Sequence, residues 1–175
     1  LFRSNKMNTM NLADTPGYYY AIAYWLSALL IVMQNKKRIK SRGWWGVQLC
    51  FLIAITVLMT VTANPDRIFF LPIMALCIFI LFLQIYTCAD FTPTVAGYYC
   101  ARAFICGEFT ASLGWQIYFY SVAGLHLKRS YLTSLLLIAV VYAVVFAVFW
   151  FLDTKQSSDE VEIRITRREC FSAII

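Results

Sequence analysis

Five long apolar runs dominate this sequence and leave little of it for any other structure. They cover about residues 17–34, 45–63, 68–87, 95–124 and 130–152. A helix crosses the hydrocarbon layer of a membrane with about 20 predominantly apolar residues. The sequence therefore predicts an all-α fold, a polytopic transmembrane helix bundle with about five spans that together form a helical domain over residues 17–152.

The amino-acid composition excludes an ordinary soluble domain. Hydrophobic residues make up 61% of the 175 residues and charged residues only 14%, whereas soluble domains are about 45–50% apolar and about 25% charged. Lys and Arg outnumber Asp and Glu by 15 to 9, but they lie in short segments beside apolar runs, as in membrane proteins. We therefore expect the lipid bilayer as the main partner and no binding of nucleic acid.

The distribution of Lys and Arg also predicts an orientation. Five of the residues 36–42 are basic, and such a segment resists translocation across the membrane. With the N-terminus outside, the inner segments hold more Lys and Arg than the outer ones. We expect a multi-pass protein of the cell membrane with an extracellular segment at 1–16 and a cytoplasmic segment at 153–175.

The two ends of the sequence suggest a fragment of a longer gene product. The first residue is Leu1 rather than Met. Residues 167–175 form a basic flank followed by a few apolar residues, a pattern typical of the start of a membrane span. We therefore expect a truncated sixth span at the C-terminal end.

The fourth apolar run carries ionisable side chains well inside it. Arg102 and Glu108 lie where a charge is costly, and such residues usually face the bundle interior, pair with each other, or mark a ligand, ion or proton site. Six residues correspond to about 600° of helical rotation, so the two side chains point to different faces. Each needs a partner on another helix or in water, although Arg102 is also near enough to the end of the run to reach the interface.

A polar stripe accompanies these residues. Glu108, Ser112 and Gln116 recur every four residues, beside Trp115. Residues four apart share a helix face, so the stripe suits the lining of an inner cavity. Two interpretations stay open: a ligand-binding or signal-coupling site that also includes Arg102, or helix packing in which Ser and Gln hydrogen-bond to neighbouring helices.

Small residues form a second feature of the same run. Ala103, Gly107 and Ala111 are also four residues apart, and such a ridge lets another helix backbone approach closely. We assign these three residues to helix packing. The sequence leaves open whether the neighbouring helix belongs to the same chain or to a second copy in a homodimer.

Aromatic residues cluster near the ends of the apolar runs, at residues 18–20, 44–45, 98–99 and 149–151. Tyr and Trp are enriched at the level of the lipid headgroups, so we interpret these clusters as interface belts. The first cluster, on the predicted outer side, is also suited to holding a hydrophobic or peptide ligand.

No catalytic motif is found in the sequence. Neither a phosphate-binding loop, a G-x-S-x-G nucleophile motif, an H-E-x-x-H zinc motif nor a dinucleotide fingerprint occurs. The single histidine, His126, falls on the predicted outer side, without nearby acidic or Cys residues that could help it bind a metal. We therefore identify no catalytic residue, no metal site and no cofactor, and whether the chain belongs to an enzyme stays open.

One distinctive segment, residues 96–118, resembles a known family. It contains the motifs Tyr98-Tyr99-Cys100, Arg102-Ala103-Phe104, Glu108-Phe109-Thr110-Ala111-Ser112 and Trp115-Gln116-Ile117-Tyr118. This pattern is similar to the membrane sensor region of GHKL-type sensor histidine kinases from Gram-positive anaerobes. The resemblance implies a membrane-embedded sensor of a bacterial two-component system, in which a signal sensed in or outside the membrane alters autophosphorylation of a cytoplasmic kinase and phosphotransfer to a response regulator. The ligand would be an unknown small molecule or peptide. That catalytic part has no counterpart in these residues.

Two other functions are compatible with the same sequence. A membrane subunit of a small-solute transporter could use Arg102 and Glu108 in a translocation path, although mirrored helices broken by Gly or Pro, typical of transport sites, are missing. A membrane scaffold without ligand or catalysis is the third interpretation.

Overall fold

The computed structural model describes residues 16–35, 38–39, 43–61, 67–124 and 131–157. Within these ranges all regular secondary structure is helical, apart from one isolated β-bridge between Ile39 and Ala89. The all-α prediction is therefore confirmed for the described part of the chain. The helices are α1 (Gly17–Gln34), α2 (Trp44–Val61), α3 (Arg67–Cys88), α4 (Pro93–Ala123) and α5 (Tyr131–Ser157).

Four of the helices begin and end within two residues of the predicted runs, but α5 does not. It continues to Ser157, five residues beyond the predicted end of the fifth run at residue 152. No Pro or Gly interrupts residues 153–157, and Lys and Gln are good helix formers. The apolar run therefore ends before the helix does.

The fourth run forms one unbroken helix of 31 residues. Pro93 stands in its first turn, where the fixed φ angle and the missing N–H of proline are tolerated. At about 1.5 Å per residue, α4 is about 46 Å long. Several predicted features lie outside the described residues, namely the segment 1–15, most of the basic segment 36–42, His126 and the residues 158–175.

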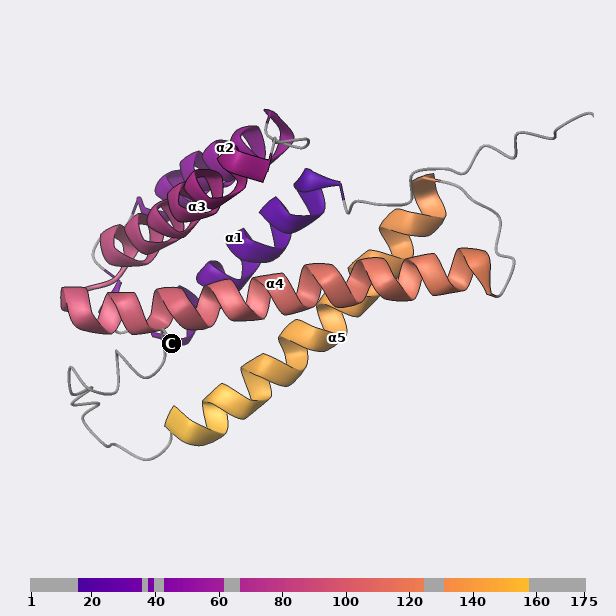
Figure 1. Cartoon of the computed structure of the whole chain (residues 1–175). Coiled ribbons are helices and arrows are strands. Elements are labelled where there is room, and N and C mark those ends of the chain that lie inside the picture. The colour runs from indigo at the N-terminus through magenta and orange to yellow at the C-terminus, as the bar shows by residue number, and fades with distance from the viewer. Residues whose placement is uncertain (1–15, 36–37, 40–42, 62–66, 125–130, 158–175) are drawn as a thin grey trace, which may run out of the picture.

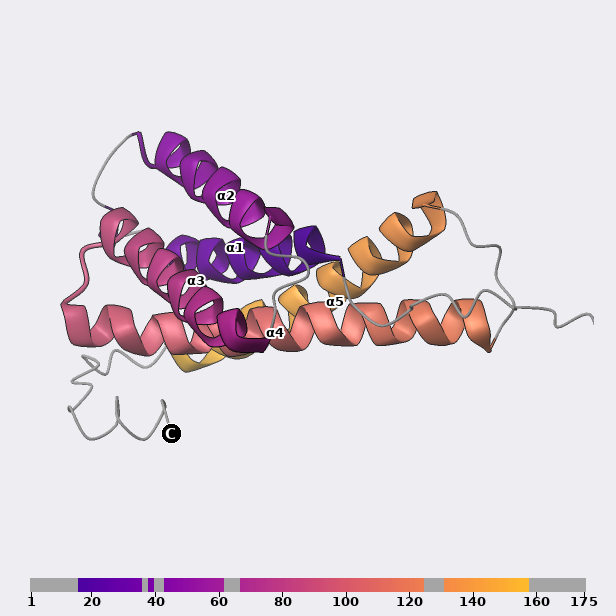
Figure 2. The ribbon, with the colours of Figure 1, turned by 45° about the horizontal axis from the view of Figure 1, so that its top comes forward.

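The helices run alternately in opposite directions (Figures 1 and 2). Gly17 at the start of α1 lies against Met59 near the end of α2. At the opposite end of the bundle, the backbone N–H of Asp90 donates to the carbonyl of Arg38 over 2.7 Å. The connections between α1 and α2 and between α3 and α4 therefore meet at the same end of the bundle.

Helix α1 occupies the centre of the arrangement and packs against all four other helices. Figure 1 shows α2 and α3 side by side on one side of α4, while α5 crosses α4. Half of the residues of α1 are buried, among them Ala21, Tyr24, Ser27 and Val32. The core of the bundle is therefore built around α1.

Three helices are long and apolar enough to cross a membrane, namely the segments Trp44–Val61, Leu71–Cys88 and Leu132–Leu152. Only 11%, 28% and 22% of these segments are buried inside the bundle. Their exposed apolar side chains indicate insertion into a membrane. This criterion therefore supports three of the five expected spans among the described residues, and a membrane crossing by α1 and α4 stays a prediction.

Candidate functional site between α1 and α4

Polar side chains join α1 to α4 at three successive levels. The hydroxyl of Tyr20 lies 3.5 Å from that of Ser112, the hydroxyl of Tyr24 donates to the carboxylate of Glu108, and the hydroxyl of Ser27 donates over 2.7 Å to the carbonyl of Ala103. Each step forward along α1 is matched by a step back along α4, as expected for antiparallel helices. We call this set of residues the α1–α4 seam.

Tyr24 is the central residue of the seam and is almost fully buried. Its ring stacks on Phe104, with 5.3 Å between ring centroids and an interplanar angle of 7°. Phe104 and Glu108 are one turn apart on α4, so Tyr24 contacts both of them from the facing helix. The ring stacking and the hydrogen bond together fix the register of α1 against α4.

The small residues of α4 allow this close contact. A β-carbon at Gly107 would lie 3.0 Å from the Cα atom of Tyr24 and 2.6 Å from its ring. Ala103 and Ala111 on the same ridge are buried as well. Helix α1 of the same chain therefore occupies the ridge that the sequence assigns to packing.

The predicted polar stripe does not stay on one side of the bundle. Glu108 and Ser112 are partly buried and reach α1, whereas Gln116 is exposed. Four residues rotate an α-helix by about 400°, so each step shifts the face by about 40°. After two steps Gln116 has turned out of the contact, and it cannot line an inner cavity with the other two residues.

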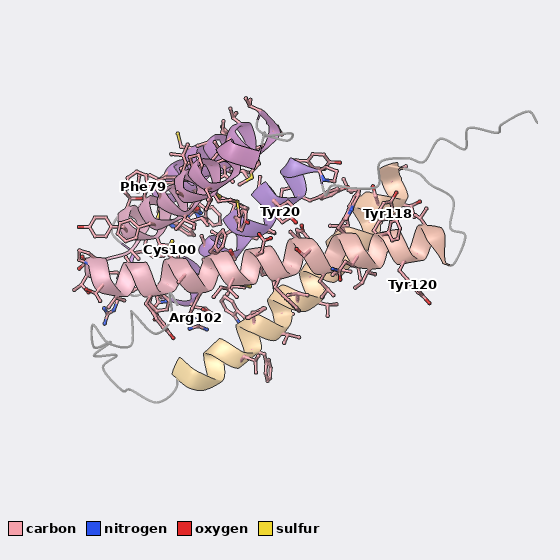
Figure 3. The ribbon with its side chains drawn as sticks, in the orientation of Figure 1. Tyr20, Phe79, Cys100, Arg102, Tyr118 and Tyr120 are labelled. Atoms are coloured by element: carbon pink, nitrogen blue, oxygen red, sulfur yellow. The ribbon has the colours of Figure 1, made fainter. Side chains whose placement is uncertain are left out.

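Trp115 lies next to the seam, in an aromatic group formed by α1 and α4. Its ring centroid is 6.0 Å from that of Tyr19 and 5.3 Å from that of Tyr118. The indole N–H is buried and has no hydrogen-bond partner among the described residues. Figure 3 labels Tyr118 at the end of α4 where α5 crosses it.

Tyr19 corrects the interpretation of the first aromatic cluster as an interface belt. Its side chain is buried, its hydroxyl lies 3.2 Å from that of Ser134 on α5, and its carbonyl accepts a hydrogen bond from the Tyr142 hydroxyl. Tyr99 of a second cluster is buried too. Pattern alone misplaces both residues because an aromatic side chain near a helix end fits a helix contact as well as a headgroup layer.

Arg102 lies outside the α1–α4 seam. Its guanidinium carbon is 5.9 Å from the ring centroid of Tyr98, one turn earlier on the same helix. Such a contact is a favourable cation–π interaction. In the view of Figure 3, Arg102 projects below α4. The described residues therefore bring Glu108 and Ser112 to α1 but leave Arg102 on another face of α4.

A second buried polar group, which sequence reasoning missed, joins α2 to α3. The side-chain amide of Gln84 donates to that of Gln48 over 2.6 Å, and both side chains are fully buried. Gln48 also donates to the sulfur of Cys88, and its backbone carbonyl accepts from the indole of Trp25. We call Gln48 and Gln84 the glutamine pair.

A signal for these missed residues was present in the sequence. Gln48 and Gln84 are the amide side chains inside the second and third apolar runs. An amide in hydrocarbon needs a hydrogen-bond partner because an unsatisfied one is costly. For Tyr20 and Tyr24 the signal was their spacing of four residues, which matches the spacing of Ser112 and Glu108.

Among the described residues, no three His, Cys, Asp or Glu side chains come together in a way that could hold a metal ion. The site therefore consists of hydroxyl, carboxylate and carbonyl oxygens between two helices. These oxygens form the hydrogen bonds that join the two helices.

Comparison with protein-family models, with curated proteins and with solved structures finds no match to this chain.

Proposed function

We propose that this chain is a membrane-embedded sensor or signal-transmitting region of a bacterial two-component histidine kinase, and that it lacks the catalytic part. In this proposal α1 and α4 cross the membrane together with the three apolar helices. The observation that carries it is the hydrogen bond between Tyr24 and Glu108 at a close contact of two helices, in a bundle whose other helices present apolar surfaces.

The alternating helix directions support five spans. The α1–α2 connection and the α3–α4 connection share one end of the bundle, where the backbones of Arg38 and Asp90 are hydrogen-bonded. The basic residues of segment 36–42 belong to the first of these connections. By the positive-inside rule that end is cytoplasmic, which gives an extracellular N-terminus and a cytoplasmic C-terminus.

The position of Glu108 along α4 supports a functional role. Cys100 on α4 donates to the carbonyl of Ile78 in the middle of α3, and Gly114 lies against Tyr142 in the middle of α5. Glu108 lies between these two levels, so it would stand near the middle of the bilayer. An ionisable residue at that depth is costly and usually serves a ligand, an ion, a proton or a moving contact.

The seam also has the pattern needed for two alternative registers. Tyr20 and Tyr24 are one turn apart on α1, and Ala103, Gly107 and Ala111 repeat at the same interval on α4. A slide of α1 by one turn, about 5.4 Å, would bring Tyr20 opposite Glu108 and Tyr24 opposite Ala103. Two packed arrangements of similar energy are what a signal-transmitting helix pair needs.

Glu108 and Tyr24 have named roles in this proposal. Glu108 accepts the hydrogen bond that holds α1 in its present register, and Tyr24 donates it. A ligand that binds Glu108 in place of the Tyr24 hydroxyl removes this bond and releases α1 from its present register. The shift of α1 then changes the position of the α1–α2 connection at the cytoplasmic end.

The alternative function, a subunit of a small-solute transporter, would place Glu108 in a translocation path. Transport sites at the midplane are commonly built from interrupted helices. The described helices are continuous, and the seam is closed by direct contacts such as that of Gly107 with Tyr24. We therefore prefer signal transmission to transport or to a passive scaffold.

Two measurements test the proposed function. The first is the gene sequence beyond the codon for Ile175, which we expect to encode a dimerisation helix and an ATPase domain. A neighbouring gene for an ATP-binding cassette protein, without such a segment, would instead support the transporter.

The second measurement is autophosphorylation of the full-length protein in lipid nanodiscs, at equal protein amounts. We expect Glu108→Gln and Tyr24→Phe to change the basal rate at least about threefold in the same direction, because both weaken the same contact. Gln48→Leu, which alters a buried polar group away from the seam, serves as the control. Equal rates for all four proteins would contradict a role of the seam in signalling.

A further inference from the structure

A basic side chain is held in place where the α1–α2 and α3–α4 connections meet. The backbone N–H of Arg38 donates to the carbonyl of Asn35 over 2.9 Å, and the carbonyl of Arg38 accepts the N–H of Asp90 over 2.7 Å. The next residue, Ile39, forms the isolated β-bridge with Ala89. The backbone of Arg38 is therefore fixed on both sides, which limits the positions that its exposed side chain can reach.

The guanidinium of Arg38 rests on an aromatic group that continues into α4. Its central carbon is 5.9 Å from the ring centroid of Phe91, a distance typical of a cation–π interaction. The ring of Phe91 is buried, and its centroid lies 5.0 Å from that of Tyr99. No carboxylate of the described residues forms an ion pair with Arg38. The aromatic contact therefore positions this cation without neutralising its charge.

Arg102 points toward the same end of the bundle. Its guanidinium carbon lies 5.9 Å from the ring centroid of Tyr98, one turn earlier on α4, so its side chain extends toward the N-terminal end of that helix. Tyr98 in turn contacts Tyr99, with 5.7 Å between ring centroids. The rings of Phe91, Tyr99 and Tyr98 therefore form a row with a guanidinium at each end. We call these three rings the aromatic row.

The depth of Arg102 along α4 matches the boundary between hydrocarbon and lipid headgroups. A helix of about 46 Å extends about 8 Å beyond each side of a hydrocarbon core that is about 30 Å thick. Arg102 follows Pro93 by nine residues, or about 14 Å, so its Cα atom lies about 6 Å inside the hydrocarbon. An extended arginine side chain covers that distance, which brings the guanidinium to the level of the headgroup phosphates.

The charge at this end of the bundle favours an anion. Residues 36–42 include five Lys or Arg and no Asp or Glu, whereas residues 88–93 contribute a single acidic residue, Asp90. Basic clusters beside membrane spans attract anionic lipids. A guanidinium also matches a phosphate in shape, because its parallel N–H groups donate to two phosphate oxygens at once.

We propose that Arg38 and Arg102 bind the phosphates of anionic phospholipids at the cytoplasmic end of the bundle, one phosphate at each guanidinium. The aromatic row holds the two cations at a fixed separation. Phosphatidylglycerol suits the site because its headgroup has no amine to oppose the basic residues of segment 36–42, whereas phosphatidylcholine carries one. This proposal rests on the orientation and on the crossing of the membrane by α4 that the proposed function includes.

Native mass spectrometry of the full chain in detergent, with added phosphatidylglycerol, tests this proposal. The spectra resolve the protein with different numbers of bound lipids and give an association constant for each binding step. We expect the wild type to bind phosphatidylglycerol more tightly than phosphatidylcholine. Arg38→Gln and Arg102→Gln should each lower the association constant for phosphatidylglycerol about fivefold, because each removes one phosphate-binding cation.

Two matched variants control for net charge and for the shape of the side chain. Arg67→Gln removes a positive charge from the start of α3, at the opposite end of the bundle, and is expected to leave the association constants unchanged. Arg38→Lys keeps the charge but loses the parallel N–H donors, so its association constant should fall between those of the wild type and Arg38→Gln.

Three results would overturn the proposed lipid site. Equal affinity of the wild type for phosphatidylglycerol and phosphatidylcholine would show that the site does not select an anionic headgroup. Equal weakening by Arg38→Gln and Arg67→Gln would show that only the net charge matters. Displacement of the lipid by inorganic phosphate in excess would show that the arginines bind a free anion and not a lipid.

A separate measurement distinguishes failure of the lipid site from failure of the proposed span. Thr92→Cys and Gly124→Cys place thiols at the two ends of α4 and are labelled from one side of a vesicle with a membrane-impermeant reagent. Labelling of both positions, above the wild-type level and from the same side, contradicts α4 as a span. Labelling of only one position, together with unchanged lipid binding by Arg38→Gln and Arg102→Gln, contradicts the lipid site alone.

Discussion

Helices α1 and α5 differ in burial in the opposite way to helices of soluble proteins, where the more apolar helix is usually the more buried one. Most of the apolar segment of α5 is exposed, with only 22% of it buried. Helix α1 contains four tyrosines, a tryptophan and a serine and falls short of the same criterion for a membrane span, yet it lies at the centre of the bundle. In lipid, burial of apolar surface does not drive helices together, because the surrounding chains are equally apolar.

The contacts of the two helices show what drives association instead. Helix α1 meets α4 through Gly107, two tyrosine hydroxyls and a serine hydroxyl. Helix α5 is held by a narrower row that includes Ser134, Ile138 and Tyr142, while more than half of its apolar segment is exposed. Small residues and hydrogen-bonding groups, rather than hydropathy, therefore decide which helix is central.

The largest expected effect is that of Gly107→Leu. A side chain at this position meets the backbone of Tyr24, so α1 and α4 must separate and the seam is lost. We expect the free energy of unfolding, measured by titration with sodium dodecyl sulfate in mixed micelles, to fall by about 3 kcal/mol. Gly46→Leu is the control, since nothing lies within 4 Å of a β-carbon there. Similar losses for both variants would mean that the contact between α1 and α4 matters no more for stability than an exposed position on an outer helix.

Tyr24→Phe tests the hydrogen bond without changing the shape of the ring. The carboxyl group of Glu108 loses its hydrogen-bond donor. We expect the free energy of unfolding, measured by the same titration, to fall by about 1–2 kcal/mol. A double-mutant cycle with Glu108→Gln isolates the pair from its surroundings. Additive effects of the two substitutions would show that the seam is held by packing alone.

Gln84→Leu tests whether polar contacts also matter between the outer helices. It removes the hydrogen-bond donor to Gln48. We expect the free energy of unfolding to fall by about 1 kcal/mol, in the upper part of the range for interhelical hydrogen bonds. The double variant Gln48→Leu with Gln84→Leu removes both amides and should recover part of this loss. A larger cost for Gln84→Leu than for Tyr24→Phe would place the main polar contact at the glutamine pair.

Val144→Leu on the exposed surface of α5 is expected to have the smallest effect. The side chain is 58% exposed, and an apolar substitution there exchanges one lipid-facing group for another. We expect the free energy of unfolding to change by less than about 0.5 kcal/mol. A loss above about 1 kcal/mol would mean that this surface contacts protein and not lipid.

The helices themselves were predictable from the sequence, and their contacts were only partly so. The bounds of α1 to α4 follow from the lengths of the apolar runs and the flanking prolines and polar residues. Glu108 and the ridge around Gly107 are visible as exceptions within one run. Tyr24, as the partner of both, was not predictable, because an aromatic residue in an apolar run gives no indication of which helix it faces.

Gln116 and Glu108 illustrate the same limit within a single helix. Their spacing of eight residues suggests a shared face, but the rotation of about 80° over that distance is enough to separate a buried position from an exposed one. Which of the two turns inward depends on where α1 lies. The position of α1 is set by the contact between Gly107 and Tyr24. These two residues lie on different helices and are 83 residues apart in the sequence.

The sequence by itself predicted the helices of the described residues and, from the apolar composition of three of them, insertion into a membrane. An apolar segment can satisfy its backbone only by hydrogen bonds within the same helix, and this requirement is local. Only the tertiary structure decided that α1 is central, that α1 and α4 are in this register and that Gln116 faces outward. These features depend on close fit and on a few hydrogen bonds between distant residues, and in an apolar medium hydropathy does not specify them.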